Sequence, residues 1–390
     1  MNVPKLRFKE FNDEWQNICL KDVFEYYSTN SLSREQLSNN GIIKNIHYGD
    51  IHKKFSTIVN VEKNVDTYIK DINYKNKYEL CKNNDLIFAD ASEDYDGIGK
   101  AIELTNVNCN TVSGLHTILA RDCKNVFASK FKGYYFNSPK VHNQIRILAN
   151  GFKVYGISKD TINKLEVNIP SINEQLKIAN TLELLDKKIE LQTKKIEDLK
   201  LFKKGLITET KKDKSDWNEF YIKDIFKITR GIVIPRTELT DTITNENIYP
   251  VYSSQTSNEG ILGYDKKYDF DGKYLTWTTD GANAGSVFFR NGKFRCTNVC
   301  GVLYNESNNY VNEMVAELLN LETPKYVSYV GNPKLMNNVM ADIKIELPNL
   351  NIQNKIATNL KLLNDKIILE NNKLNKLQQL KKGLMQKMFV

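Results

Sequence analysis

A 37-residue segment occurs twice, in similar form, along this chain. Residues 170–206 read PSINEQLKIANTLELLDKKIELQTKKIEDLKLFKKGL, and residues 348–384 read PNLNIQNKIATNLKLLNDKIILENNKLNKLQQLKKGL. The two segments align without a gap at an offset of 178 residues and are identical at 18 of 37 positions. Such repetition predicts that the chain contains two copies of one plan.

Apolar residues recur every seven positions in both segments, which predicts long helices that pack as a coiled coil. Pro170 and Pro348 stop the strand-like runs before them, and Gly205 and Gly383 are expected to mark the helix ends. Roughly 30 helical residues at about 1.5 Å each would form a rod of about 45 Å, the length of a spacer. The expected seam of the helix pair consists of Ile178, Leu182, Leu185, Ile189, Gln192, Ile196, Leu199, Ile356, Leu360, Leu363, Ile367, Glu370, Leu374 and Leu377.

The two apolar stripes are nearly equal, so the helices are expected to pack on each other in antiparallel directions. Gln192 and Glu370 interrupt the seam near its middle. They either face one another in a polar layer that fixes the register, or both reach solvent. Four leucines outside the seam either bind a partner protein or pack against the chain's own domains: Leu184, Leu191, Leu362 and Leu369.

A second echo opens each half of the chain. Residues 15–24 read WQNICLKDVF and residues 217–226 read WNEFYIKDIF, at an offset of 202 residues. The residues between each opening and its helix differ in length and sequence, and alternate short apolar runs with Gly, Asn and Asp, which is typical of strands with some helix. We therefore predict an α+β chain with two pseudo-symmetric α/β domains, 1–169 and 207–347, separated by antiparallel helical segments 170–206 and 348–390.

The net charge of +8 and the pI of about 8.9 favour an acidic partner, most simply nucleic acid. Basic and aromatic residues interleave in both variable domains, although abundant Lys and Asn equally fit an AT-biased genome. The glycine-containing basic loops 151–156 and 331–334 either approach phosphate or are plain surface turns. The candidate DNA-binding residues are Lys53, Lys54, Lys130, Lys132, Tyr134, Arg146, Lys153, Tyr155, Arg230, Lys266, Lys267, Lys325 and Lys334.

Motifs for catalysis are missing from the sequence. It has no Gly-x-x-x-x-Gly-Lys-Ser/Thr loop, no Gly-x-Gly-x-x-Gly fingerprint and no Asn/Asp-Pro-Pro-Tyr/Phe tetrapeptide. Its four histidines form no pair at metal-ligand spacing, and its six cysteines are expected to be free thiols. Asp94, Asp96 and Asp280 could be nuclease carboxylates, but turns are the better interpretation. No signal peptide or membrane span is expected, so we predict a cytoplasmic protein without catalytic or metal-binding residues.

With its opening PKLRFKEF and Trp15, the partial echo at Trp217 and the twin Pro-led helices ending in Lys-Lys-Gly-Leu, the chain resembles the specificity subunit of type I restriction–modification systems. Tyr48-Gly-Asp50-Ile also fits the style of this family. The resemblance implies that each variable domain is a target recognition domain for one half of a split DNA site, and that the helices set the gap between the halves. It also implies docking of two modification subunits, joined by restriction/translocase subunits.

The same resemblance implies that S-adenosylmethionine, ATP and magnesium belong to those partner subunits, and that this chain binds no cofactor. Two other functions remain open at this point. A stand-alone DNA-modifying enzyme would transfer methyl groups by itself. A coiled-coil scaffold that binds only proteins would show no salt-dependent DNA binding even with its partners present.

Overall fold

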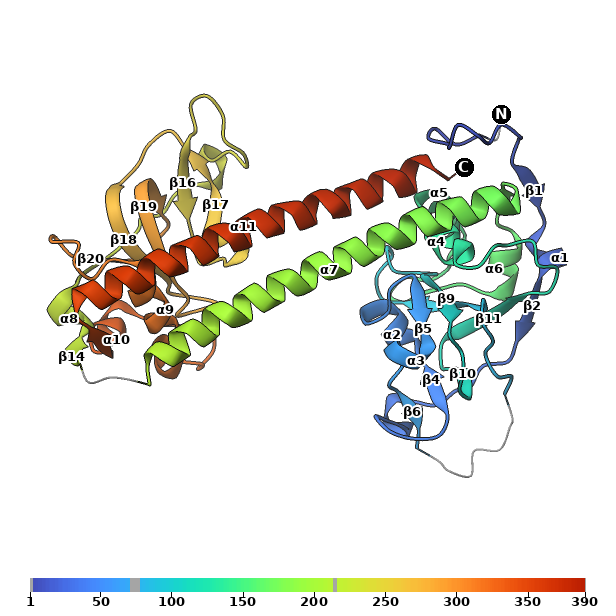
Figure 1. The fold of residues 1–390 in the computed structure, drawn as a ribbon, viewed down its shortest axis with the longest axis horizontal. Helices are drawn as coiled ribbons and strands as arrows, with labels where there is room; N and C mark the ends of the chain where they lie inside the picture. The colour runs from blue at the N-terminus through green and yellow to red at the C-terminus, as the bar shows by residue number, and fades with distance from the viewer. Residues whose placement is uncertain (1–2, 71–77, 213–215, 390) are drawn as a thin grey trace. The chain divides into compact units, whose positions relative to one another are not determined.

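The computed structural model describes residues 3–70, 78–212 and 216–389, which form two compact units. The first unit contains residues 1–192 and 373–390, and the second contains residues 193–372. Two long, unbroken helices, α7 (Ile172–Thr210) and α11 (Leu350–Lys387), each contribute one part to each unit (Figure 1). A mixed α/β chain with two long helices is what the sequence predicted.

Two main sheets form the variable domain of the first unit. The five-stranded sheet has the order β2 (Phe24–Tyr27), β11 (Thr117–Asp122), β7 (Leu86–Ala89), β9 (Ala101–Thr105) and β5 (Ile58–Asn60). The four-stranded sheet has the order β10 (Thr111–Ser113), β4 (Lys44–Ile46), β6 (Tyr68–Ile69) and β3 (Leu37–Ser38). The helices of this domain are α1 (Leu20–Val23), α2 (Tyr48–Lys53), α3 (Val61–Asn64), α4 (Phe131–Phe136), α5 (Pro139–Leu148) and α6 (Lys159–Asn163).

The second unit has a six-stranded sheet in its variable domain. Its order is β15 (Lys227–Arg230), β20 (Cys300–Tyr304), β18 (Phe270–Thr278), β19 (Val287–Cys296), β16 (Tyr249–Tyr252) and β17 (Ile261–Asp265). The helices of this domain are α8 (Ile222–Ile225), α9 (Glu313–Glu322) and α10 (Asn337–Ala341). Trp277, on β18, is fully buried, and its indole nitrogen donates to the Leu335 carbonyl at 3.1 Å. That contact fixes the segment before α10 to the sheet.

In each unit the strand formed by the opening echo pairs, antiparallel, with the strand that leads into the long helix. In the first unit β1 (Gln16–Ile18) pairs with β13 (Val167–Ile169), and in the second β14 (Trp217–Tyr221) pairs with β21 (Lys344–Pro348). The opening of each half therefore lies beside the segment that leads into its long helix. Each variable domain is thus closed by the same kind of strand pair, at the point where the domain joins its helix.

A repeated glutamine fastens each long helix to its domain. The Gln175 side chain accepts the Ala128 N–H at 2.8 Å and donates to the carbonyls of Val126 and Pro170. Gln353 donates to the Pro348 carbonyl at 2.8 Å and accepts from the Asn312 amide at 3.2 Å. Both glutamines are buried, so these bonds satisfy polar groups that water cannot reach.

The predicted ends of the long helices were wrong. Gly205 lies inside α7, and Gly383 lies inside α11, which continue to Thr210 and Lys387. A glycine inside a helix costs about 1 kcal/mol relative to alanine. In the second unit the burial of Ile207, just after Gly205, offsets that cost, because Ile207 is part of the core.

Candidate nucleic-acid interface and helix pair

In the first unit the beginning of α7 packs against the end of α11. Ile178 and Leu182 share a core with Met388 and Phe389. Further along α7, Asp186 forms an ion pair with Lys381 at 2.5 Å. As the residue number rises on α7 it falls on α11, so the two helices run antiparallel in this unit.

The second unit shows the same direction. Lys195 of α7 forms an ion pair with Glu370 of α11 at 2.9 Å. Ile207, near the end of α7, shares a core with Ile356 and Leu360, near the start of α11. The predicted antiparallel packing is thus present within each unit.

All of the predicted seam residues are buried or half-buried. Gln192 is half-buried, and Glu370 is only 2% exposed. Glu370 is held by Lys195 in the packed seam and does not reach solvent. Of the two alternatives for this residue, exposure to solvent is therefore excluded. A buried carboxylate with a lysine partner is a polar position that disfavours other registers of the helix pair.

The leucines outside the seam are exposed. Leu184 and Leu191 lie on α7 in the first unit, and Leu362 and Leu369 lie at the equivalent positions of α11 in the second. Each of the four is more than half exposed, so none is covered by the chain's own domains. Each unit therefore presents one pair of leucines spaced seven residues apart, on one face of a helix.

Three candidate DNA contacts of the first domain lie in or against the core. Lys132 and Tyr134 are each 1% exposed, and Lys132 lies 3.6 Å from the buried Glu103. Tyr134 donates to Asp186 at 2.8 Å, and Lys130 forms an ion pair with Glu183 at 2.7 Å, both on α7. The structure therefore corrects the prediction for Lys132 and Tyr134, whose burial keeps them from a duplex. Lys130 joins its domain to the helix.

The buried Glu103 explains why a lysine stands inside this domain. Burial raises the pKa of Glu103, while the nearby Lys132 ammonium and the N–H groups of Lys130 and Gly133 lower it. The two carboxylate oxygens accept those N–H groups at 2.7 and 2.8 Å. Glu103 thus holds the beginning of α4, and Lys132 supplies the neighbouring positive charge.

Other candidates of the first domain lie at its surface. Lys53 and Lys54 are exposed at the end of α2, where Lys54 pairs with Asp66. Lys153 is exposed in the loop before β12 (Tyr155–Gly156). Arg146 and Tyr155 both contact the ring of Tyr95. The guanidinium carbon of Arg146 lies 5.7 Å from the centroid of that ring, and the ring centroid of Tyr155 lies 5.0 Å from it.

Tyr95 is a surface residue that the sequence did not single out. Its hydroxyl donates to the Arg146 carbonyl at 3.2 Å, and Arg146 also pairs with Asp96. Asp96, one of the two possible nuclease carboxylates of this loop, therefore has a structural partner. Tyr95, which is exposed, and the half-buried Arg146 and Tyr155 form one cluster beside the loop that carries Lys153.

The candidates of the second domain are exposed or half-exposed. Lys266 and Lys267 lie in the turn between β17 and β18. Lys325 forms an ion pair with Glu322 at 2.5 Å, and Lys334 lies 3.8 Å from Asp280. Arg230 donates to the Asn337 side chain at 3.3 Å. Lys334, Asp280, Arg230 and Asn337 bring the end of β15, the end of β18 and the start of α10 to one region.

Arg290, a buried guanidinium of the second domain, was not singled out by any sequence pattern. It stacks 3.6 Å from the ring centroid of Tyr252 and donates to the Thr276 hydroxyl and the Glu259 carbonyl. Glu259 and its neighbour Asn258 both have positive φ, which is uncommon for residues other than glycine. Arg290 therefore holds a strained turn, and burial lowers the pKa of its guanidinium.

Neither metal-binding nor membrane-spanning features occur in the described part of the chain. Within residues 3–70, 78–212 and 216–389, no group of three or more His, Cys, Asp or Glu side chains is placed to hold a metal ion. Over the same ranges, no helix combines the length and apolar character that crossing a bilayer requires.

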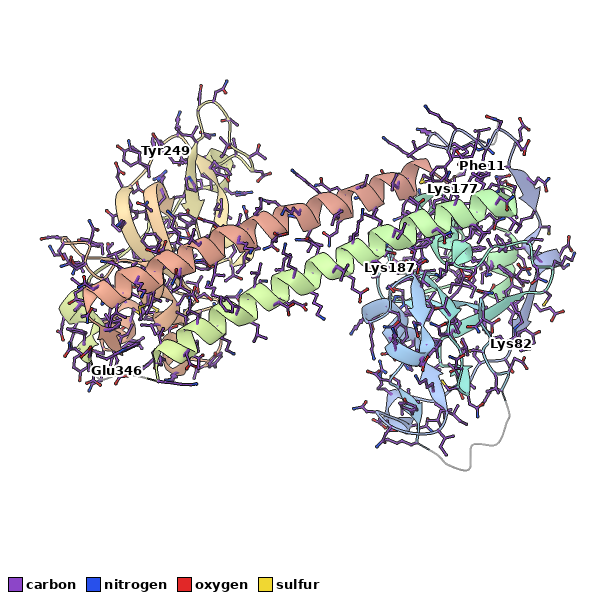
Figure 2. All side chains as sticks on the ribbon, viewed as in Figure 1. Phe11, Lys82, Lys177, Lys187, Tyr249 and Glu346 are labelled. Atoms are coloured by element: carbon purple, nitrogen blue, oxygen red, sulfur yellow. The ribbon has the colours of Figure 1, made fainter. Side chains whose placement is uncertain are left out.

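Side chains on the helices and strands are drawn in Figure 2. Lys177 and Lys187 lie on the first-unit part of α7, where they pair with Glu10 and Glu183. Glu346 lies on β21 of the second unit.

Two α/β domains, each joined to the same antiparallel helix pair and each carrying exposed basic and aromatic residues, define a bipartite recognition protein.

Comparison with known proteins gives the family. The family model of the type I restriction modification DNA specificity domain matches residues 12–201 and again residues 214–379. The chain belongs to this family, whose members are the non-catalytic DNA-recognition components of type I restriction–modification systems.

Individual relatives agree with this assignment. A putative type I specificity subunit of Mycoplasma pneumoniae is 35% identical over 239 residues, which are 58% of this chain and 85% of the relative. The specificity subunit of the type I restriction enzyme MpnII from the same organism is 44% identical over 151 residues, 37% of this chain and 44% of that protein.

Solved structures support the fold. The crystal structure of the S subunit of a type I restriction-modification system from M. genitalium has a TM-score of 0.66 and 17% identity. The match covers 100% of this chain and 99% of that one. A chain from a structural study of type I restriction–modification complex assembly has a TM-score of 0.53 and 13% identity, with 98% and 99% covered.

Proposed function

We propose that each variable domain of this specificity subunit binds one half of a bipartite target in double-stranded DNA. The observation that carries the proposal is that equivalent strand pairs join the ends of each variable domain, while the sequence in the middle of each domain differs. In the first unit β1 pairs with β13, and in the second β14 pairs with β21. The two domains are attached to the helices in the same way but differ from each other in sequence. This arrangement suits the recognition of two half-sites that differ in base sequence.

The helix pair would set the gap between the half-sites. α7 has 39 residues and α11 has 38, so each is about 58 Å long at about 1.5 Å per residue. Two domains can approach one face of a duplex when their half-sites lie about one helical turn, roughly 34 Å, apart. A helix of this length is sufficient for a separation of that order.

Two modification subunits would dock on the helices, and restriction/translocase subunits would join them. The exposed pairs Leu184/Leu191 and Leu362/Leu369 give each unit the same apolar face, as two copies of one partner require. S-adenosylmethionine, ATP and magnesium would be bound by those partners, and this chain would hold none of them. The assembly would act on DNA in the cytoplasm.

The docking surface is testable by stoichiometry. Replacing Leu184 and Leu191 with Asp should remove one modification subunit, because burying an unpaired charge at an interface is unfavourable. Replacing Leu362 and Leu369 should remove the other. Mass photometry of the co-expressed complex would show the loss of one subunit in each case. Leu201→Asp is the matched control, because Leu201 is exposed on α7 but its repeat counterpart is Gln379. Unchanged stoichiometry in both double variants would exclude this surface.

The proposed function as a whole is tested by mapping adenine methylation in genomic DNA from cells that contain this chain and its modification partner. We expect one split motif with a fixed gap, and its complete loss when the gene for this chain is deleted. A methylation pattern that survives the deletion would contradict the proposal. Methyl transfer by the isolated chain would instead support a stand-alone enzyme.

A further inference from the structure

The two basic loops singled out in the sequence are hairpins with the same closure. In residues 150–156, Asn150 and Gly156 exchange two backbone hydrogen bonds, at 3.0 and 2.7 Å. In residues 328–334, Ser328 and Lys334 exchange two bonds, both at 2.9 Å. We call these segments the first and second tip hairpins. Each encloses five residues, and the offset between them is 178, the same offset that relates the long helices.

Both tip hairpins are fixed in the same way to their domains. The residue after the first hairpin, Ile157, donates its N–H to the Asp90 carbonyl at 2.9 Å, just beyond β7. The residue after the second, Leu335, donates to the Thr279 carbonyl at 2.9 Å, just beyond β18. β7 and β18 are equivalent strands, because each pairs with the strand, β11 or β20, that also pairs with β2 or β15.

The geometry is kept although the sequence is not. The first hairpin reads NGFKVYG and the second SYVGNPK, which agree at no position. The glycines also differ: Gly151 has φ +128°, where a Cβ would meet the Val154 carbonyl oxygen at 2.0 Å, whereas Gly331 has φ +74° and open space around it. A partner that binds in two copies needs two similar surfaces, and the repeated helices have such surfaces. The two hairpins differ in sequence, so they suit two different ligands of one chemical class instead.

Each hairpin carries an exposed apolar residue at the same position. Phe152 is 100% exposed and Val330 is 92% exposed, the two highest values for large apolar side chains among the described residues. Positions 152 and 330 are related by the offset of 178. Apolar side chains held in water on short, closed hairpins gain free energy only when a ligand covers them.

Basic residues lie in or near both hairpins. Lys153 follows Phe152 directly and is exposed, and Arg146 lies beside the first hairpin through Tyr95, which contacts Tyr155. In the second unit Lys334 closes the hairpin and Lys325 precedes it. Cations beside an exposed apolar tip suit a duplex, in which lysine or arginine meets phosphate while the apolar group contacts a base, for example a thymine methyl.

We infer that the tip hairpins enter the DNA, with Phe152 contacting bases of one half-site and Val330 contacting bases of the other. This inference rests on the proposed function, because it names residues that would read the half-sites. On this inference, specificity depends on side chains that occupy the same position in the two domains but differ in identity.

The test uses the full chain assembled with its modification subunit and the duplex that carries the split motif found by methylation mapping. Phe152→Ala and Val330→Ala should each weaken binding to this duplex roughly tenfold, the scale of one lost base contact. Ile42→Ala and Ile243→Ala remove exposed apolar side chains elsewhere in the same two domains and should leave binding unchanged. Thermal unfolding should be the same for all four variants, since each replaced side chain is exposed.

Single base-pair substitutions then distinguish base contact from general weakening. In Phe152→Ala, substitutions at the base pair that Phe152 contacts should no longer reduce affinity, while those in the other half-site keep their full effect. Val330→Ala should show the reverse pattern. If both variants bind the motif as tightly as the wild-type complex does, the inference is overturned. The proposed function would still stand in that case, provided that the wild-type complex binds the motif more tightly than a scrambled duplex in the same assay.

Two other outcomes would also overturn the inference. Loss of the modification subunit from Phe152→Ala or Val330→Ala complexes would show that the hairpins contact protein. Equal weakening on the motif and on the scrambled duplex would show a contact without base recognition. Failure of the wild-type complex to prefer the motif would count against the proposed function itself.

Discussion

The two units complete their cores with different parts of the chain. In the first unit Met388 and Phe389, just beyond the end of α11, pack with Phe131 and Tyr135, more than 240 residues earlier in the sequence. In the second unit Ile207, at the end of α7, packs against the domain that follows it directly. The ends of α11 and α7 therefore both complete the core of a domain. In the first unit the contact joins residues far apart in the sequence, and in the second it joins residues close in the sequence.

Ion pairs show the same contrast between repeated residues. Lys381 pairs with Asp186 on the opposite helix, whereas its repeat counterpart Lys203 pairs with Glu317 of α9 at 2.5 Å. The counterpart of Asp186 is Asn364, which offers no carboxylate. The same lysine therefore joins helix to helix in one unit and helix to variable domain in the other. Repeated sequence does not guarantee a repeated contact, because the partner has to be repeated as well.

The largest expected effect comes from removing the distant contact. Phe389→Ala should lower the stability of the first domain by about 3–5 kcal/mol, as truncation of a buried phenylalanine does, and leave the second domain unchanged. Hydrogen exchange measured peptide by peptide would separate the two domains. Ile207→Ala is the matched variant, expected to destabilise the second domain by about 2–5 kcal/mol. Equal loss of protection in both domains from either variant would contradict the separate cores.

An intermediate effect is expected from the repeated glutamines. Gln175→Met would leave two buried backbone groups and the part-buried Val126 carbonyl without their side-chain partner, and Gln353→Met would leave one buried backbone group and the Asn312 amide. Each unsatisfied buried group costs about 1–3 kcal/mol, so the first variant should be the more destabilising. Urea denaturation monitored by hydrogen exchange would rank them. Gln386→Met, at an exposed position, serves as the control. The reverse order would show that the two anchors are not used as the hydrogen bonds indicate.

The smallest expected effect concerns pH. All four histidines belong to the first domain, and burial lowers the pKa of His142 below its ordinary value of 6.5. As the pH falls through about 6.5, the unfolded chain binds a proton at this residue before the folded chain does, so stability falls. His142→Gln retains a donor for the Ile98 carbonyl, which the ring contacts at 2.9 Å, and should flatten this fall in the first domain alone. An identical pH profile for wild type and variant between pH 7 and 5 would contradict it.

Much of the fold could be predicted from the sequence. The heptads at Ile178, Leu182 and Leu185 and their repeats predicted the helix pair, and the echoes at Trp15 and Trp217 predicted where each half begins. The candidate site was less predictable. Lys132 and Lys153 are equally basic in the sequence, yet the first is buried beside Glu103 and the second is exposed on a hairpin. Composition and spacing carry no information on which lysine a fold covers.

The repeat, the two long helices, the division into variable and repeated parts, and the family can all be read from the amino-acid sequence. Periodic burial along a helix needs the same residue types at fixed spacing, so it remains visible in the chain. The folded chain was needed to show that Gly205 and Gly383 lie within helices, and that NGFKVYG and SYVGNPK form equivalent hairpins. Those hairpins are closed by backbone hydrogen bonds, which nearly every residue can make, so no identical side chain marks their equivalence.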